Sequence, residues 1–193
     1  MKKKLVVVLL SAAMCVAALG GCGSKAGSSS DSSKKTVENS SKEDDQKAAD
    51  EVAKKIDAIY VQKRNDKTDE QCKEAKEAWD KLTDAQKELV EGENADPDYF
   101  GRDTGDASKD DPRNQDDIGE NELLVVSFGT SFNDSRVKDI KGIEDALQEA
   151  NPDWSVRRAF TAQIIINHVE ARDGECIDNM DQALERAVAN GVK

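Results

Sequence analysis

Apolar residues along the chain are gathered in separate stretches, and polar segments divide them. A largely apolar run lies near the start of the chain at 5–19, and residues 22–46 are almost wholly Ser, Lys, Glu, Asp and Gly. Periodic apolar positions follow at 47–92 and again at 121–193, with a segment rich in Gly, Pro and Asp at 93–120 between them. The pattern predicts two folded parts that polar segments connect to each other and to the N-terminus.

The N-terminus has the features of a lipoprotein signal peptide. Three lysines precede the apolar run, which at about fifteen residues is too short to span a bilayer comfortably and suits a secretion signal. The run ends in Leu19-Gly20-Gly21-Cys22, which resembles the bacterial lipobox. We expect residues 1–21 to be the signal peptide, Cys22 to carry lipid, and 22–46 to be a disordered tether. An ordinary signal peptide followed by a chance cysteine is the alternative.

Residues 47–92 are predicted to form a small helical unit. Apolar residues at i, i+3, i+4 and i+7 indicate one helix over about 45–60 and a second one after Thr68. Thr68 and Thr83 each open a capping-box pattern, and the second box predicts a short helix that ends at Leu89 and Val90. The pattern resembles short helical repeats of Gram-positive surface proteins. The residues expected to be buried are Ile56, Ile59, Trp79, Leu82 and Leu89.

Residues 93–120 are predicted to be a solvated acidic linker, because Pro and Gly interrupt a run of Asp. Tyr99 and Phe100 are its aromatic spot and are expected to dock onto a neighbouring domain. The Asp residues at 103–106 lack the spacing and terminal Glu of an EF-hand, so a calcium site is not expected.

Residues 121–193 have the pattern of an α/β domain. The apolar run 123–128 predicts a strand covered on both faces, and 154–160 predicts a second strand. Helices should follow both strands, and a third helix should follow after a turn at Asp173-Gly174. This order is the βαβ opening of a doubly wound sheet, and a third strand should begin at Val192-Lys193. We therefore expect the chain to be a fragment of a longer protein.

The helices of this part have expected caps and expected inward faces. The caps are Asn133 or Asp134, Thr161 and Asp178. The residues expected to face inward are Ile140, Ile143, Ala146, Leu147, Ala150, Ile164, Ile165, Val169, Leu184 and Val188.

The loop after the first strand, 127–134, is the expected ligand site, because open α/β sheets bind ligands at the carboxyl ends of their strands. Gly129 would allow close approach of the backbone, and Thr130 and Ser131 supply hydroxyls. The loop lacks the Lys of a P-loop and the spacing of a dinucleotide fingerprint. Ser131 has no base nearby in the sequence, which disfavours a hydrolase nucleophile. A turn that binds nothing remains the structural alternative.

Four sequence blocks lie in this part in a fixed order: 124–131; 158–161 with Ile164 and Ile165; 172–174; and 177–178 leading to Ala183 and Leu184. They resemble the anaerobic-type cobaltochelatase family of cobalamin synthesis, which inserts Co2+ into sirohydrochlorin. The resemblance implies two α/β halves with the tetrapyrrole in the cleft between them. The substrate-binding residues that it implies are Ser127, Gly129, Thr130, Ser131, Arg158, Phe160 and Thr161.

The resemblance also implies where the metal chemistry lies. The family's metal-binding histidines and glutamate are expected beyond Lys193, so no catalytic and no metal-binding residue is assigned in this chain. His168 is instead expected to be a boundary histidine at the edge of an apolar helix face. Co2+ would be a substrate of the full-length protein, and no cofactor is expected to be bound by this part. One of Arg157 and Arg158 could equally point to solvent on an edge strand.

The composition limits the classes of partner that the protein could bind. The chain of 193 residues has 40 Asp and Glu against 28 Lys and Arg, a net charge of -12, which argues against a nucleic-acid partner. One histidine excludes a His-rich metal site built from this chain alone. Once the signal cysteine and Cys22 are set aside, Cys72 and Cys176 remain and are expected to be structural thiols.

Three functions stay open at this point. The first is a chelatase anchored by lipid to the outer side of the cell membrane, acting on sirohydrochlorin. The second is a surface lipoprotein that binds tetrapyrrole, haem or metal without insertion. The third is a structural lipoprotein whose helical unit matters most. Homo-oligomerisation is left open in all three.

Overall fold

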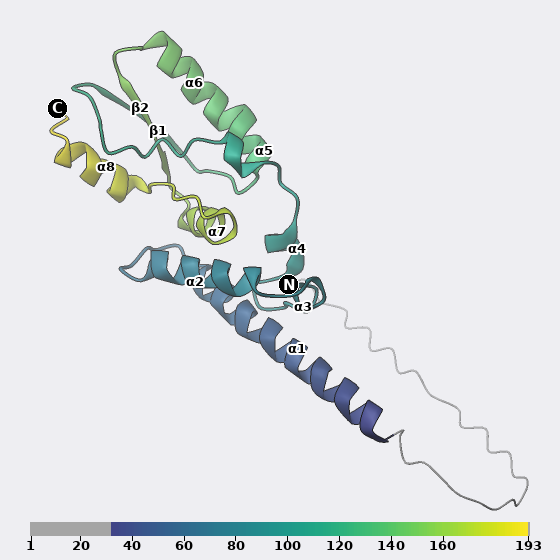
Figure 1. Ribbon diagram of the computed structural model, residues 1–193. Helices are drawn as coiled ribbons and strands as arrows, with labels where there is room; N and C mark the ends of the chain where they lie inside the picture. The colour runs from purple at the N-terminus through teal and green to yellow at the C-terminus, as the bar shows by residue number, and fades with distance from the viewer. Residues whose placement is uncertain (1–31, 193) are drawn as a thin grey trace, which may run out of the picture.

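The computed structural model describes residues 32–192 (Figure 1). The predicted signal peptide and Cys22 lie outside the described residues. In the part of the chain that is described, no helix is long and apolar enough to cross a membrane. The N-terminal half contains α1 (Ser32–Ile59), α2 (Thr68–Asp80), α3 (Asp84–Lys87), α4 (Pro97–Gly101) and the 3-10 helix η1 (Ala107–Lys109).

The apolar stripes of α1 and α2 meet in one core, as the periodicity predicts. Ile56, Ile59, Trp79 and Leu82 are all buried, but Leu89 is 37% exposed. Helix α3 ends at Lys87, so the helical spacing no longer applies at Leu89, and Val90 is buried in its place.

Helix α1 begins at Ser32, within the segment that the sequence predicts to be a tether as far as residue 46. The sequence from 32 to 46 contains neither Gly nor Pro. Extending a helix that is already nucleated fixes few further dihedral angles per hydrogen bond, so a polar segment can continue a helix whose far end is packed. The packed end here is the stretch around Ala49, Val52 and Ile56.

Of the two predicted capping boxes, one is present. Thr83 accepts from the backbone N–H of Gln86, and Gln86 accepts from that of Thr83. Thr68 is instead buried, and its hydroxyl accepts from the backbone N–H of Asn65 in the preceding loop. The pattern of residue types is the same at both positions, and tertiary burial decides between them.

The C-terminal half is α/β, as predicted (Figure 1). Its elements are β1 (Glu122–Ser127), α5 (Asn133–Ser135), the π-helix η2 (Arg136–Ile140), α6 (Lys141–Ala150), β2 (Ser155–Phe160), α7 (Gln163–Asp173) and α8 (Met180–Ala189). β1 and β2 pair in parallel, with Glu122 opposite Ser155 and Ser127 opposite Phe160. Helix α6 covers one side of this pair, and α7 and α8 lie on the other side.

The prediction that β1 is covered on both faces is wrong for the described residues. Val126 is 45% exposed and Phe128 is 71% exposed. Exposure is also found for five residues that were expected to face inward: Ile143, Ala146, Ala150, Leu184 and Val188. The sheet of the described residues has two strands, so each strand is an edge and few side chains can pack over either face.

The helix caps of this half differ from those predicted. α5 and α7 have no side-chain cap, and α8 is capped by Asn179 in a capping box with Gln182. Asn133 and Asp178 are buried and form side-chain contacts with arginines, while Thr161 is exposed one residue before the N-cap of α7. Buried polar groups need partners, and for Asn133 and Asp178 the partners are arginines from other elements.

The segment 93–120, which the sequence predicts to be a solvated acidic linker, contacts the α/β half along part of its length, and we call it the strap. The Thr104 carbonyl accepts from the backbone N–H of Asp134 at 2.7 Å. Asn114 donates to the carbonyl of Cys176 at 2.7 Å, and the side chain of Asp110 is fully buried. Most of the strap's charged residues are exposed, but Asp110 pairs with Arg136 and Arg158, which the sequence does not mark as its neighbours.

The helical unit docks on α7 through α1, α2 and Phe100. The Asn167 side chain donates to the carbonyl of Ile59 at 2.8 Å, and Ala171 belongs to the same apolar core as α1 and α2. The expected docking of the aromatic spot occurs at Phe100, whose ring lies 5.4 Å from that of Trp79 and 5.3 Å from that of His168. His168 is therefore a buried residue of this interface and not a boundary histidine.

A titratable cluster lies between α2 and α7. Burial raises the pKa of Glu170 to about 7, and the charge of Asp69 acts in the same direction. Arg64 opposes this shift. The Cys72 thiol hydrogen-bonds to Glu170, and burial raises the pKa of that thiol too. Cys72 is thus an inert buried thiol, whereas Cys176 is exposed, and both are free.

The raised pKa of Glu170 predicts a pH dependence of stability. The folded state holds the proton more tightly than the unfolded state, so this group's stabilisation is complete below about pH 4.5 and is lost as pH rises through about 7. We expect the free energy of unfolding of Glu170→Gln to exceed that of the wild type by about 2 kcal/mol at pH 8 and to be nearly equal to it at pH 4.5. Urea unfolding between pH 4.5 and pH 8 measures this difference, with Glu77→Gln as the exposed control. The prediction would be contradicted if the free energy of unfolding changed equally with pH in the wild type and in Glu170→Gln.

Candidate functional site

The carboxyl ends of β1 and β2 bring together residues that are far apart in the sequence. The backbone N–H of Thr161 donates to the carbonyl of Ser127 at 2.9 Å, and that of Ala162 donates to the carbonyl of Phe128 at 3.3 Å. Four of the residues implied by the family resemblance, Ser127, Gly129, Phe160 and Thr161, therefore lie at this edge of the sheet. It is the edge at which α/β proteins bind ligands.

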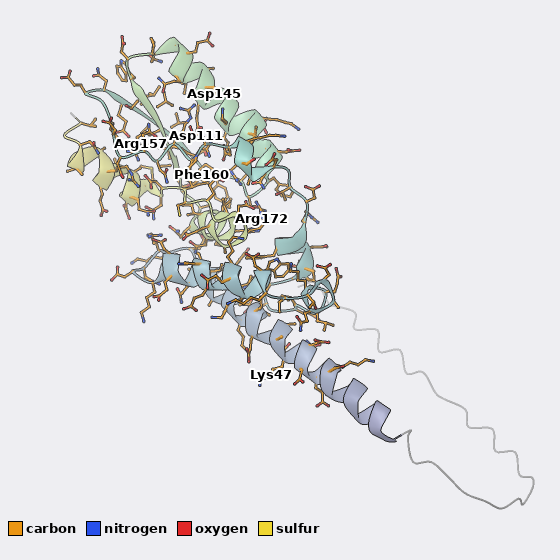
Figure 2. The ribbon with its side chains drawn as sticks, in the orientation of Figure 1. Lys47, Asp111, Asp145, Arg157, Phe160 and Arg172 are labelled. Carbon is orange, nitrogen blue, oxygen red and sulfur yellow. The ribbon has the colours of Figure 1, made fainter. Side chains whose placement is uncertain are left out.

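Gly129 approaches a side chain of the protein rather than a ligand. Its φ is +94°, and a Cβ at this position would lie 2.4 Å from a carbon of the Phe160 ring. Phe160 is fully buried between the sheet and α7 (Figure 2). These two residues therefore form the floor under the loop, because the missing Cβ of Gly129 lets the backbone lie directly against the Phe160 ring.

The loop after Gly129 is held by its carbonyl groups. The carbonyl of Ser131 accepts from Arg172 at 2.7 Å, and the carbonyls of Thr130 and Ser131 both accept from Arg136 at 3.4 Å. The Thr130 hydroxyl oxygen accepts from the backbone N–H of Phe132 at 3.2 Å, which leaves its own O–H to donate. Thr130 and Ser131 remain half-buried at the surface of the loop.

Arg158, which the resemblance implied for substrate binding, is buried within the fold. Its guanidinium donates to both carboxylate oxygens of Glu144 at 2.9 and 2.8 Å and to both of Asp110 at 2.7 and 2.9 Å. None of this side chain is exposed. Among the described residues, Arg158 thus connects the strap and α6 to β2.

The surrounding charges keep this network ionised. Burial alone would raise the pKa of Asp110, but hydrogen bonds and charges from Arg158 and Arg136 outweigh it and hold the pKa below its usual value. Burial alone would lower the pKa of Arg158, and the contacts with Glu144 and Asp110 outweigh that in turn. Arg136 also donates to Asp110 at 2.8 Å and to Glu175 at 2.8 Å.

Arg157, labelled in Figure 2, is buried too. Neither arginine of β2 therefore points to solvent. Arg157 donates to Asp178 at 2.8 Å and to Glu122 at 3.3 Å. Arg186 of α8 also donates to Asp178, at 3.0 Å to each carboxylate oxygen. Asp178 consequently joins β2 to α8 instead of capping the helix.

The sequence did carry a signal for part of this network. Glu144 lies four residues after Ile140 and three before Leu147, so it shares the face of α6 that points to the sheet. A carboxylate on an apolar face needs a buried cation as a partner. No comparable signal marks Asp110, which stands in a segment of many similar acidic residues.

A cavity of about 230 Å3 lies beside the carboxyl end of β2. One wall comes from the α/β half, and the other comes from the loop that joins α1 to α2. The lining residues are Gln62, Lys63, Arg64, Phe160, Thr161, Gln163, Asn179, Met180 and Asp181. Gln163 is fixed there, because it donates to Asn167 at 2.8 Å and accepts from Asn179 at 2.9 Å. The helical unit thus contributes directly to the edge where Thr161 lies.

Among the described residues, no group of three or more His, Cys, Asp or Glu is arranged to hold a metal ion. His168 stacks on Phe100 at the interface with the helical unit, away from the loop after β1. The described residues therefore present hydroxyls, amides and basic side chains at the strand ends, a set suited to binding anionic groups.

Comparison with known proteins agrees with this arrangement. Residues 121–193 match the family model described as Cobalt chelatase (CbiK). The chain is 46% identical over 71 residues to the sirohydrochlorin cobaltochelatase of Salmonella typhimurium (strain LT2), an alignment that covers 37% of this chain and 27% of that protein. No solved structure matches.

These matches confirm the resemblance that the four sequence blocks indicate. The family match is confined to the α/β half, and the chain spans about a quarter of the length of the curated relative. The strap and the helical unit lie outside the matched residues.

Proposed function

On the premise that residues 121–193 are cobaltochelatase-like, we propose that this chain takes part in the insertion of Co2+ into sirohydrochlorin. The observation that carries the proposal is the 46% identity over 71 residues to a sirohydrochlorin cobaltochelatase, together with the family match at 121–193, which includes both strand ends and the loop after β1. Sirohydrochlorin and Co2+ are the two substrates of the proposed reaction.

Binding and orienting the tetrapyrrole is the part of the reaction that these residues support. Thr130, Ser131 and Thr161 present hydroxyls at the strand ends, where the carboxylate arms of the macrocycle can accept hydrogen bonds. Gly129, Phe160 and Arg158 act beneath this surface, where they fix the position of the loop and of β2. Metal insertion also requires removal of the pyrrole N–H protons, and we assign no described residue to that step.

The proposal is tested with the whole gene product, purified sirohydrochlorin and Co2+. Absorbance of the macrocycle should change as the metallated form accumulates, at a rate at least tenfold above that of the protein-free mixture. A rate no faster than that of the protein-free mixture would overturn the proposed enzymatic activity. Saturable binding without acceleration would support the alternative, in which a surface lipoprotein captures a tetrapyrrole without inserting metal.

We also propose that the protein is anchored by lipid at Cys22 to the outer side of the cell membrane. The lipobox-like ending of the apolar run supports this, and the two acyl chains that a lipobox cysteine carries anchor a protein more stably than a single chain. Cys22→Ser should move the protein from the membrane fraction to the soluble fraction. Retention of this variant in membranes would contradict lipid anchoring.

A further inference from the structure

The cavity at the carboxyl end of β2 unites the part of the chain that resembles chelatases with a part that does not. Thr161, Gln163 and Asn179 lie within the matched residues, whereas Lys63 and Arg64 belong to the helical unit. At about 230 Å3 the cavity is smaller than the roughly 300–1,000 Å3 of sites that enclose whole ligands. It can take one arm of a tetrapyrrole but not the macrocycle.

The loop that carries Lys63 is held in place by its own hydrogen bonds. Asn65 accepts from the backbone N–H of Lys67 at 2.8 Å, and its own backbone N–H donates to Thr68 at 2.9 Å. Arg64 pairs with Asp69 through both terminal nitrogens, so its charge is already engaged. The α1 end of the loop is tied to α7 by the bond from Asn167 to Ile59. A loop fixed in this way can present a side chain at little further entropic cost.

Lys63 is the cation of this cavity that is left to bind a ligand. Its side chain is exposed, and among the described residues it makes no ion pair. Around it the cavity offers the Thr161 hydroxyl and the start of α7, which has no side-chain cap. Asp181 is the acidic residue of the cavity lining, and its side chain is exposed to solvent. A cation, a hydroxyl and an uncapped helix start together favour a carboxylate.

We propose that the helical unit supplies Lys63 as a specificity-determining residue, which binds one carboxylate arm of the tetrapyrrole at the carboxyl end of β2. This inference rests on the proposed function. It gives the helical unit a role in recognising substrate, in addition to its position between the N-terminal segment and the α/β half. The cobaltochelatase-like residues would position the macrocycle over the strand ends. Lys63 would favour substrates that have a carboxylate arm next to this cavity.

The test is a titration of sirohydrochlorin, followed by absorbance, with wild-type protein and with Lys63→Gln. We expect Lys63→Gln to raise Kd roughly fivefold to tenfold and to weaken its dependence on NaCl concentration. Lys54→Gln is the matched control, because Lys54 is an exposed lysine of the same unit and the variant has the same net charge. It should stay within twofold of wild type, and Lys63→Arg should keep most of the affinity.

The outcomes separate this inference from the proposed function. Wild-type binding with equal Kd values for Lys63→Gln and Lys54→Gln would overturn the role of Lys63 and leave the proposed function standing. No binding of sirohydrochlorin by the wild type would overturn both. Equal urea midpoints for the lysine variants would show that a change in Kd arises at the cavity and not from loss of the fold.

Discussion

Arg158→Ala should lower the free energy of unfolding by about 3–5 kcal/mol, because it removes one partner of a buried ion-pair network. Asp110 and Glu144 would keep their negative charges in a site from which water is excluded, since both side chains are fully buried. Arg136 still contacts Asp110 and Arg113 still contacts Glu144, so part of the compensation would remain. The loss should therefore be large without abolishing folding.

Urea unfolding of Arg158→Ala at pH 7 measures this effect, with Arg102→Ala as the control. Arg102 is exposed, and its replacement should change the free energy of unfolding by no more than about 0.5 kcal/mol. If Arg158→Ala behaved like this control, Arg158 would not be held in the network, and its side chain would be free to reach a substrate.

Gly129→Ala should destabilise the protein by about 3 kcal/mol, for two separable reasons. A φ of +94° is a conformation that residues with a Cβ rarely adopt, and the new Cβ would lie 2.4 Å from a carbon of the Phe160 ring. The ring is fully buried and has little room to move away. The loop that carries Thr130 and Ser131 should shift as a result, so affinity for the tetrapyrrole should fall together with stability.

Gly142→Ala provides the contrasting glycine. Gly142 lies in α6, and a Cβ there would meet nothing within 4 Å. Alanine has the higher helix propensity, so this variant should be more stable by up to about 1 kcal/mol. A Gly129→Ala protein as stable as wild type would mean that the loop after β1 can relax away from Phe160, contrary to the geometry described above.

The segments at 47–92, 93–120 and 121–193 are more closely connected than three successive units would be. Asp110 in the strap contacts both β2 and the π-helix through Arg158 and Arg136, while α1 and α2 share a core with Ala171 of α7. The strap and the helical unit, which lie outside the cobaltochelatase-like residues, thus contact and stabilise the elements around the strand ends. Lys63 reaches the same edge for the same reason, since docking on α7 places the loop after α1 beside β2.

The sequence alone determined the local features of the chain. The pattern of apolar residues located α1, α2, β1, β2, α7 and α8, and for α1 and α2 it also gave the buried face, because burying one face requires a spacing that can be read residue by residue. The capping box at Thr83 and the left-handed Gly174 and Gly191 at helix ends follow from the same local chemistry. The four blocks in 121–193 were enough to establish the resemblance to cobaltochelatases.

Only the tertiary structure decided which charges are buried and what they contact. Asp110 and Arg158 are separated by 48 residues, and their pairing depends on how the strap crosses the sheet. Ion pairing has no period along a chain, and one Asp of an acidic segment is indistinguishable from its neighbours until the fold selects it. The same holds for Gly129 under Phe160, His168 against Phe100, and Lys63 at the end of β2. Local spacing predicts an element and its buried face, whereas contacts between distant side chains depend on how the elements pack against one another.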